Sequence, residues 1–242
     1  MNVFQDSGLQ RVALPSTLRV LDNKTFQNCE NLKKIYVEDG CEADLSNIKI
    51  QNSTKVGPPP ETMAGNARVW DLRGCKDIVI PEGVETIGNY WFWGSTAEGV
   101  TISASVKEIG TDAFCYCRNL KRVICADGSR LEKIGPGCFC ASGIERIVIP
   151  KNVKEIQDST FRECENLKEV VFEAGSALKE ISDCAFLGCT SLMNIQLPDG
   201  LEKIGAGCFS NSGLEEVLIP SNVVVIEEDA FKGDKNLKKV SF

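Results

Sequence analysis

The sequence predicts a solenoid of stacked, parallel β coils. One observation is a recurring phenylalanine at steps of 22 to 25 residues, at Phe92, Phe114, Phe139, Phe161, Phe186, Phe209 and Phe231. The other is the spacing between two such residues: from Phe139 to Phe161 the apolar residues follow at steps of 5, 3, 2, 4, 3 and 5. A coil of this size cannot bury its own apolar edge, so consecutive coils must stack on one another.

Each repeat contains two extended pieces. The pattern Leu-x-x-Val-x-Ile alternates between apolar and variable positions, as in a half-buried strand. The second piece, Val-x-x-Ile, leads into a short turn or a single helical turn that carries the phenylalanine. Glycine and proline between the pieces prevent long helices. We therefore expect a mostly β repeat with short helical turns, and about ten turns of 22–25 residues.

The repeat runs through the whole chain, so residues 1–242 are expected to form a single solenoid. It is regular over 84–242 and degenerate over 38–75, where Gly57–Glu61 forms a proline-rich loop. The phase survives that stretch, because Trp70 lies 44 residues after Phe26 and 22 before Phe92. We therefore place Trp70 in a phenylalanine position, with the loop pushed outward.

The full pattern, Leu-x-x-Val-x-Ile-Pro-x-x-Val-x-x-Ile-x-x-x-x-Phe-x-x-Cys, resembles the BspA-like branch of the leucine-rich repeat family. The resemblance covers almost the whole chain, most strongly over 84–242. It implies a curved leucine-rich repeat solenoid with a parallel sheet on its concave face. It also implies a microbial cell-surface protein that binds host or bacterial partners. The family has no shared catalytic residues to transfer to this sequence.

The composition excludes several classes of function. The net charge of −7 disfavours nucleic acid and anionic membranes as partners, and no apolar run is long enough to span a bilayer. The chain contains no histidine, which removes the commonest general base and metal ligand. We therefore predict no enzyme activity and no cofactor or metal.

The 12 cysteines mostly keep a fixed distance from the repeating phenylalanine. Such a column is typical of a tightly packed core, in which cysteine acts as a small apolar residue. Two alternatives remain open. Disulfides joining Cys115 to Cys140 or Cys164 to Cys189 fit the spacing of adjacent strands. A zinc site built from the Cys-x-Cys pairs is disfavoured, because zinc ligands usually have two or more residues between them.

The variable positions of the long strand project away from the core and form the predicted concave face. The two positions before the valine carry 10 positive and 6 negative charges over ten repeats, on a chain that is acidic overall. Lysine also suits exposed strands, because it discourages aggregation. The functional interpretation is a basic groove for acidic partners. Its candidate binding residues are Arg11, Lys33, Lys34, Lys76, Lys121, Arg122, Arg146 and Lys168.

The third variable position adds an apolar row along the same groove. Its candidate binding residues are Tyr36, Ile124, Val148 and Val171. Such a row indicates a contact surface, although β-branched residues also suit any strand. A secondary aromatic patch is predicted at Trp91 and Trp93, since tryptophan is frequent in interface hot spots. The alternative is that one of the two covers a weakly packed turn.

Together these features predict a non-enzymatic protein-binding or adhesion module that recognises a protein or an anionic glycan. The favoured location is the cell surface or the secreted fraction, as part of a longer protein. The alternative is a cytoplasmic leucine-rich repeat scaffold with reduced core cysteines. Neither end of the sequence has the polar cap that a solenoid needs, so we expect flanking sequence or dimerisation to cover an end.

Overall fold

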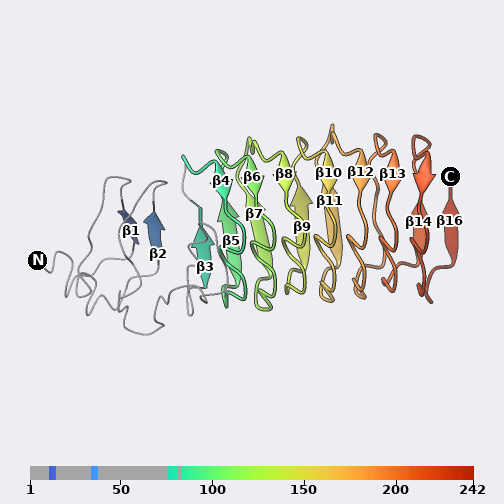
Figure 1. The fold of residues 1–242 in the computed structure, drawn as a ribbon, viewed down its shortest axis with the longest axis horizontal. Helices are drawn as coiled ribbons and strands as arrows, with labels where there is room; N and C mark the ends of the chain where they lie inside the picture. The colour runs from blue at the N-terminus through green and yellow to red at the C-terminus, as the bar shows by residue number, and fades with distance from the viewer. Residues whose placement is uncertain (1–10, 15–33, 38–75, 81–82) are drawn as a thin grey trace, which may run out of the picture.

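The structure, a computed structural model, describes residues 11–14, 34–37, 76–80 and 83–242. The degenerate stretch 38–75 with its proline-rich loop, and the positions of Phe4, Phe26 and Trp70, lie outside the described residues. The described chain winds into coils that follow one another from the N-terminal to the C-terminal end (Figure 1).

A typical coil contributes one long and one short strand. The long strands are β1 (Arg11–Leu14), β2 (Lys34–Val37), β3 (Asp77–Val79), β5 (Gly99–Ile102), β7 (Arg122–Cys125), β9 (Arg146–Ile149), β11 (Glu169–Phe172), β14 (Glu216–Leu218) and β16 (Lys239–Ser241). The short strands are β4 (Thr86–Ile87), β6 (Glu108–Ile109), β8 (Lys133–Ile134), β10 (Glu155–Ile156), β12 (Glu180–Ile181), β13 (Lys203–Ile204) and β15 (Val225–Ile226). Both sets appear in Figure 1 as rows of arrows that point in opposite directions.

All strand pairs in the described residues are parallel. The short strands form one continuous sheet of seven, in the order β15-β13-β12-β10-β8-β6-β4. The long strands form three separate sheets, β11-β9-β7-β5-β3, β14-β16 and β1-β2. The solenoid class is therefore confirmed. The described part contains about seven of the roughly ten turns expected from the sequence.

The core is a single column of side chains between the two sets of strands. Six consecutive ring pairs from Phe92 to Phe231 stack with centroids 5.0, 5.4, 5.6, 5.2, 5.4 and 5.4 Å apart. The rings of Phe139 and Phe161 are parallel to within 1°. The five rings from Phe114 to Phe209 are fully buried. The phenylalanines therefore lie in register, as the repeat predicts.

The short helical turns expected around each phenylalanine are absent from the described residues, which contain no helix. The reason lies in the direction of the backbone amides. Around Phe114 every second amide donates to the next coil, from Phe114 to the Cys138 carbonyl and from Tyr116 to the Cys140 carbonyl, both at 2.8 Å. The backbone alternates through left-handed conformations, such as a φ of 57° at Tyr116. Amides used between coils cannot bond within a helix.

Candidate functional site

The outward side chains of the long strands form what we call the long-strand face, the surface that the sequence analysis assigned to the concave side. Its central column carries Val79, Thr101, Ile124, Val148 and Val171 from β3, β5, β7, β9 and β11. Ile124 is 52% exposed, and the other four are half-buried. Gln196 interrupts the column, which resumes at Leu218, 63% exposed. The structure thus brings three of the predicted apolar residues, Ile124, Val148 and Val171, together in this column. The fourth, Tyr36, belongs to β2.

Charged side chains pair across this face, mostly between neighbouring coils; Arg122 of β7 and Asp77 of β3 pair across β5. The shortest bond joins Arg146 Nε to Glu169 Oε2 at 2.7 Å. The other pairs are Arg122–Asp77 at 3.2 Å, Lys168–Glu145 at 3.4 Å, Lys76–Glu98 at 3.7 Å and Lys238–Glu215 at 3.2 Å. Because all of these groups are solvent-exposed, each pair contributes at most about 1 kcal/mol to stability. Their main effect is to neutralise charge within the face.

Within the described residues, the long-strand face is therefore not a simple basic groove, because most of its basic side chains are paired with acidic ones. Arg122 and Arg146 lie opposite each other on β7 and β9, and each also has an acidic partner. Lys121 forms no ion pair in the described part of the chain, so it is the predicted binding cation most open to a partner. Arg11 and Lys34 lie opposite each other on β1 and β2. Lys33 lies outside the described residues.

The two predicted tryptophans lie in the turn that precedes β5, away from the outward rows of the strands. Trp91 is half-buried, and its ring packs edge-on against Phe92 with centroids 6.4 Å apart. Trp93 is 45% exposed and packs edge-on against Tyr116 at 5.5 Å. The guanidinium of Arg118 lies 6.0 Å from the Tyr116 ring. Tyr116 and Arg118 extend the exposed aromatic patch, and they become visible only when successive coils are aligned.

Most of the described cysteines are core residues. The thiols of Cys117, Cys164 and Cys189 donate to the carbonyls of Phe92, Phe139 and Phe161, at 2.9, 3.0 and 3.2 Å. Burial raises the pKa of Cys117 and of Cys164 to about 12. A thiol with so high a pKa is a poor nucleophile, because the thiolate is the reactive form.

Cys115 and Cys140 differ from this column, because their thiols are hydrogen-bonded to each other across adjacent coils. That bond raises the pKa of Cys115 and lowers the pKa of Cys140, which is also the more exposed of the two. The turns that carry the two cysteines run side by side, because the Tyr116 amide donates to the Cys140 carbonyl at 2.8 Å. A disulfide requires such an approach of the two backbones. Cys140 is the more exposed of the two thiols, so we expect it to be the first to react with a disulfide in solution, with Cys115 beside it.

We expect glutathione disulfide to convert this pair into an intramolecular disulfide. The Cys140 thiolate displaces one glutathione, and Cys115 then displaces the second, so that two thiols are oxidised and two molecules of reduced glutathione are released. Peptide mapping by mass spectrometry should find the Cys115–Cys140 cross-link. In the Cys115→Ser control, Cys140 should keep one bound glutathione. A first cross-link between Cys164 and Cys189 would contradict this assignment.

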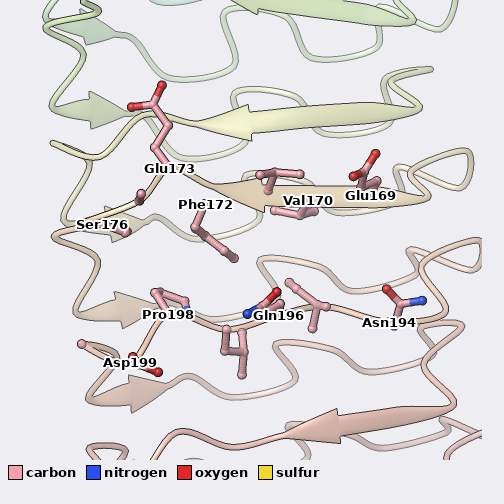
Figure 2. Close-up of a pocket in the computed structure, with 15 residues that line it drawn as sticks. Glu169, Val170, Phe172, Glu173, Ser176, Asn194, Gln196, Pro198 and Asp199 are labelled. Atoms are coloured by element: carbon pink, nitrogen blue, oxygen red, sulfur yellow. The ribbon is translucent and has the colours of Figure 1, made fainter.

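A groove opens in the long-strand face beside β11. It has a volume of about 450 Å³ and is lined by residues 169–176 and 194–200. Figure 2 shows β11 on one side and the segment around Asn194, Gln196 and Pro198 on the other, where no strand arrow is drawn. Segment 194–197 occupies the place of the next long strand, and the two sheets end on either side of it. We call this opening the seam.

Other kinds of site are not evident in the described residues. No group of three or more histidine, cysteine, aspartate or glutamate side chains there is placed to hold a metal ion. Burial raises the pKa of Asp234 to about 6, and the Ser212 amide donates a hydrogen bond to its carboxylate at 2.6 Å. None of the described residues belongs to a helix that is long and apolar enough to cross a membrane.

The fold and the surface define a class of repeat protein: a parallel β solenoid with an inward phenylalanine column and an outward strand face. The family model for the BspA type leucine-rich repeat region matches this chain with six copies, over residues 1–53, 71–168 and 155–242. The chain belongs to the BspA-type leucine-rich repeat family. The resemblance inferred from the sequence is confirmed.

Several solved structures are similar to this chain. The Treponema pallidum leucine-rich repeat protein TpLRR has 24% identity over 69% of each chain, with a TM-score of 0.51. A leucine-rich cell surface protein of Faecalibacterium prausnitzii has 21% identity over 69% of each chain, with a TM-score of 0.36. The pneumococcal vaccine antigen PcpA has 18% identity over 96% of this chain and 61% of its own, with a TM-score of 0.39. At 24% identity and a TM-score of 0.51, the likeness to TpLRR supports the fold alone. No curated protein matches the sequence.

Proposed function

We propose that this chain is a non-enzymatic recognition module whose long-strand face binds a protein partner. The observation that carries the proposal is the outward apolar column, in which Ile124 is 52% exposed beside the half-buried Val148 and Val171. Contiguous exposed apolar surface on a soluble protein usually marks a contact site. A sheet held by coil-to-coil hydrogen bonds loses little conformational entropy on binding, which favours affinity.

A protein partner fits this face better than an anionic glycan does. A polyanion requires several cations free of acidic partners, whereas Lys76, Arg122, Arg146 and Lys168 all lie within ion-pair distance of acidic side chains. An apolar column bordered by paired charges instead resembles the apolar centre and polar rim of a protein interface. Adhesion, placement on the cell surface and the alternative of an intracellular scaffold stay predictions.

The test uses the full chain as bait and then measures affinity for the purified partner that it retains. Ile124→Asp places a charge in the centre of the apolar column, and we expect it to raise the Kd at least tenfold, which corresponds to about 1.4 kcal/mol. For an acidic partner, the double variant Lys121→Glu, Arg122→Glu should weaken binding and flatten its dependence on salt.

The matched control is Lys154→Glu, an exposed charge reversal next to short strand β10 and so outside the long-strand face. It should leave the affinity unchanged. Circular dichroism should show all variants folded, because the substituted side chains are exposed. If Ile124→Asp and Lys154→Glu both bind like the wild type, the long-strand face is not the binding surface.

A further inference from the structure

An aromatic patch lies on the turns that precede β5 and β7, outside the long-strand face. Trp93 directly follows the buried Phe92 and is 45% exposed, and Tyr116 of the next coil is 44% exposed. Their rings meet edge-on, with centroids 5.5 Å apart and an angle of 66° between the planes. An edge-on contact covers the face of at most one of the two rings. Flat aromatic surface therefore stays open to solvent.

The backbone at Tyr116 is unfavourable for a tyrosine. Tyr116 has a φ of 57°, in the left-handed region that glycine adopts freely and bulky side chains rarely adopt. The same place in three other coils, two residues after the phenylalanine, is taken by Gly94, Gly188 and Gly233, with φ between 68° and 78°. The fold therefore does not require a large side chain at this position. An exposed ring held there at a conformational cost points to a function.

The exposed side chain of Arg118 borders the two rings. Its guanidinium carbon lies 6.0 Å from the centroid of the Tyr116 ring, within the range of a cation–π contact. Within the described part of the chain Arg118 forms no ion pair, whereas Arg162 pairs with Glu163 at 3.3 Å. A guanidinium held against a ring keeps N–H donors free around its edge, and those donors match the two oxygens of a carboxylate. The patch therefore combines aromatic surface with a carboxylate receptor.

The size of the patch favours a small ligand. Two rings that are each less than half exposed offer far less surface than the roughly 800 Å² that each partner contributes to a stable protein interface. In the next coil the same position holds the half-buried Ala141, and one coil further the charged pair of Arg162 and Glu163 ends the apolar surface. A sugar ring fits this area, because one of its faces consists largely of C–H groups that pack against the negative face of an aromatic ring.

The charge around the patch limits the ligand to few negative groups. Arg118 is a single cation and accepts one carboxylate. The chain as a whole carries a net charge of −7, which disfavours a densely charged polyanion. A sugar chain in which neutral units alternate with units that carry one carboxylate meets both conditions.

We propose that the aromatic patch binds an acidic oligosaccharide. A neutral sugar ring stacks on Trp93, and Arg118 binds the carboxylate of an adjacent acidic sugar. Trp93 and Arg118 both lie against the ring of Tyr116, so they are close enough to meet neighbouring units of one sugar chain. Tyr116 positions both groups. The site lies outside the long-strand face, so the proposal goes beyond the proposed protein recognition and does not depend on it.

The first experiment titrates the full chain with two sugar probes of defined charge and follows binding by calorimetry. The acidic probe is a hexasaccharide of alternating glucuronate and N-acetylglucosamine, and the neutral probe is a hexasaccharide of N-acetylglucosamine alone. The acidic probe should bind at least tenfold more tightly, and only its affinity should fall as salt is added. If the acidic probe shows no saturable binding, or both probes bind equally, the proposal is wrong.

Variants assign the two parts of the ligand to their residues. Trp93→Ala should weaken binding of both probes at least tenfold. Arg118→Gln should lower the affinity for the acidic probe to that for the neutral one and leave the neutral probe unaffected. The matched control Arg130→Gln removes the same charge from an exposed arginine between β7 and β8, at the other end of the coil, and should bind both probes like the wild type. Equal losses in Arg118→Gln and Arg130→Gln would contradict a specific carboxylate site.

A further comparison separates this site from the long-strand face. Ile124→Asp should bind the acidic probe like the wild type. If it abolishes that binding, the sugar lies on the long-strand face and the aromatic patch is not the site. If the acidic probe does not bind while Trp93→Ala weakens a protein partner, the patch is a protein contact. The acidic-sugar proposal is then overturned, and the recognition function stands.

Discussion

Replacing Phe161 with alanine should lower the free energy of unfolding by about 3–5 kcal/mol, the cost of removing a buried aromatic ring and leaving a cavity. The ring is fully buried between Phe139 and Phe186, at centroid distances of 5.6 and 5.2 Å. The cavity cannot collapse easily, because the coils on either side are held by their own hydrogen bonds. Urea-induced unfolding, followed by circular dichroism, measures the loss.

Phe231 provides a matched control for this substitution. It belongs to the same column, but it is only half-buried and stacks on a single described ring, Phe209, at 5.4 Å. Phe231→Ala should therefore cost clearly less than Phe161→Ala, because less apolar surface is transferred to water. If the two substitutions lower the free energy of unfolding equally, burial within the stacked column is not what makes Phe161 stabilising.

Replacing Gly143 with alanine should cost about 3 kcal/mol, at the upper end of the range for overpacking. An added Cβ would clash with the Arg118 carbonyl oxygen and lie 2.9 Å from its carbon, both of which are backbone atoms of the previous coil. Gly143 already donates its amide to the Cys117 carbonyl at 3.1 Å, so the two backbones are in contact. Alanine can be accommodated only if the coils move apart. Thermal unfolding monitored by calorimetry measures the effect.

Gly200→Ala is the control, because its added Cβ would meet backbone atoms at 3.6 and 3.9 Å, which is ordinary van der Waals contact. It should change the free energy of unfolding by less than about 1 kcal/mol. A neutral Gly143→Ala would mean that the coils do not approach as closely as the structure shows. Gly213 offers a second test, because its Cβ would clash with the Thr190 carbonyl oxygen in the same way.

The spacing of residues predicts the coil, the core and the rows of the surface. Every coil closes after a similar number of residues, so residues such as Phe114, Phe139 and Phe161 must lie above one another once one pair does. The same argument places Ile124 and Val148 in one outward column. Of the two forms expected around the phenylalanine, a short turn or a single helical turn, the structure has the short turn. Period alone does not show whether an amide such as that of Phe114 bonds within its coil or to the next one.

The charged rows show a second difference between the sequence pattern and the structure. A sum over the rows indicates an excess of cations. The net charge that a partner meets depends instead on which basic and acidic side chains pair between coils. The alternation of sign along one column, Lys76, Glu98, Lys121, Glu145 and Lys168, is the signal that indicates pairing. At the seam the corresponding signal is the pair Asn194 and Gln196, whose β propensity is lower than that of the valines and isoleucines around them.

The sequence by itself determined the stack of coils, the identity of the buried column and the residues that share each outward row. The tertiary structure alone decided which charges pair, which two thiols touch and where the long-strand face opens. The physical reason is that repeat length fixes which residues are neighbours in adjacent coils. The distance between those neighbours depends on the small offset and twist of one coil relative to the next. Those displacements arise from packing over the whole coil, and no local pattern encodes them.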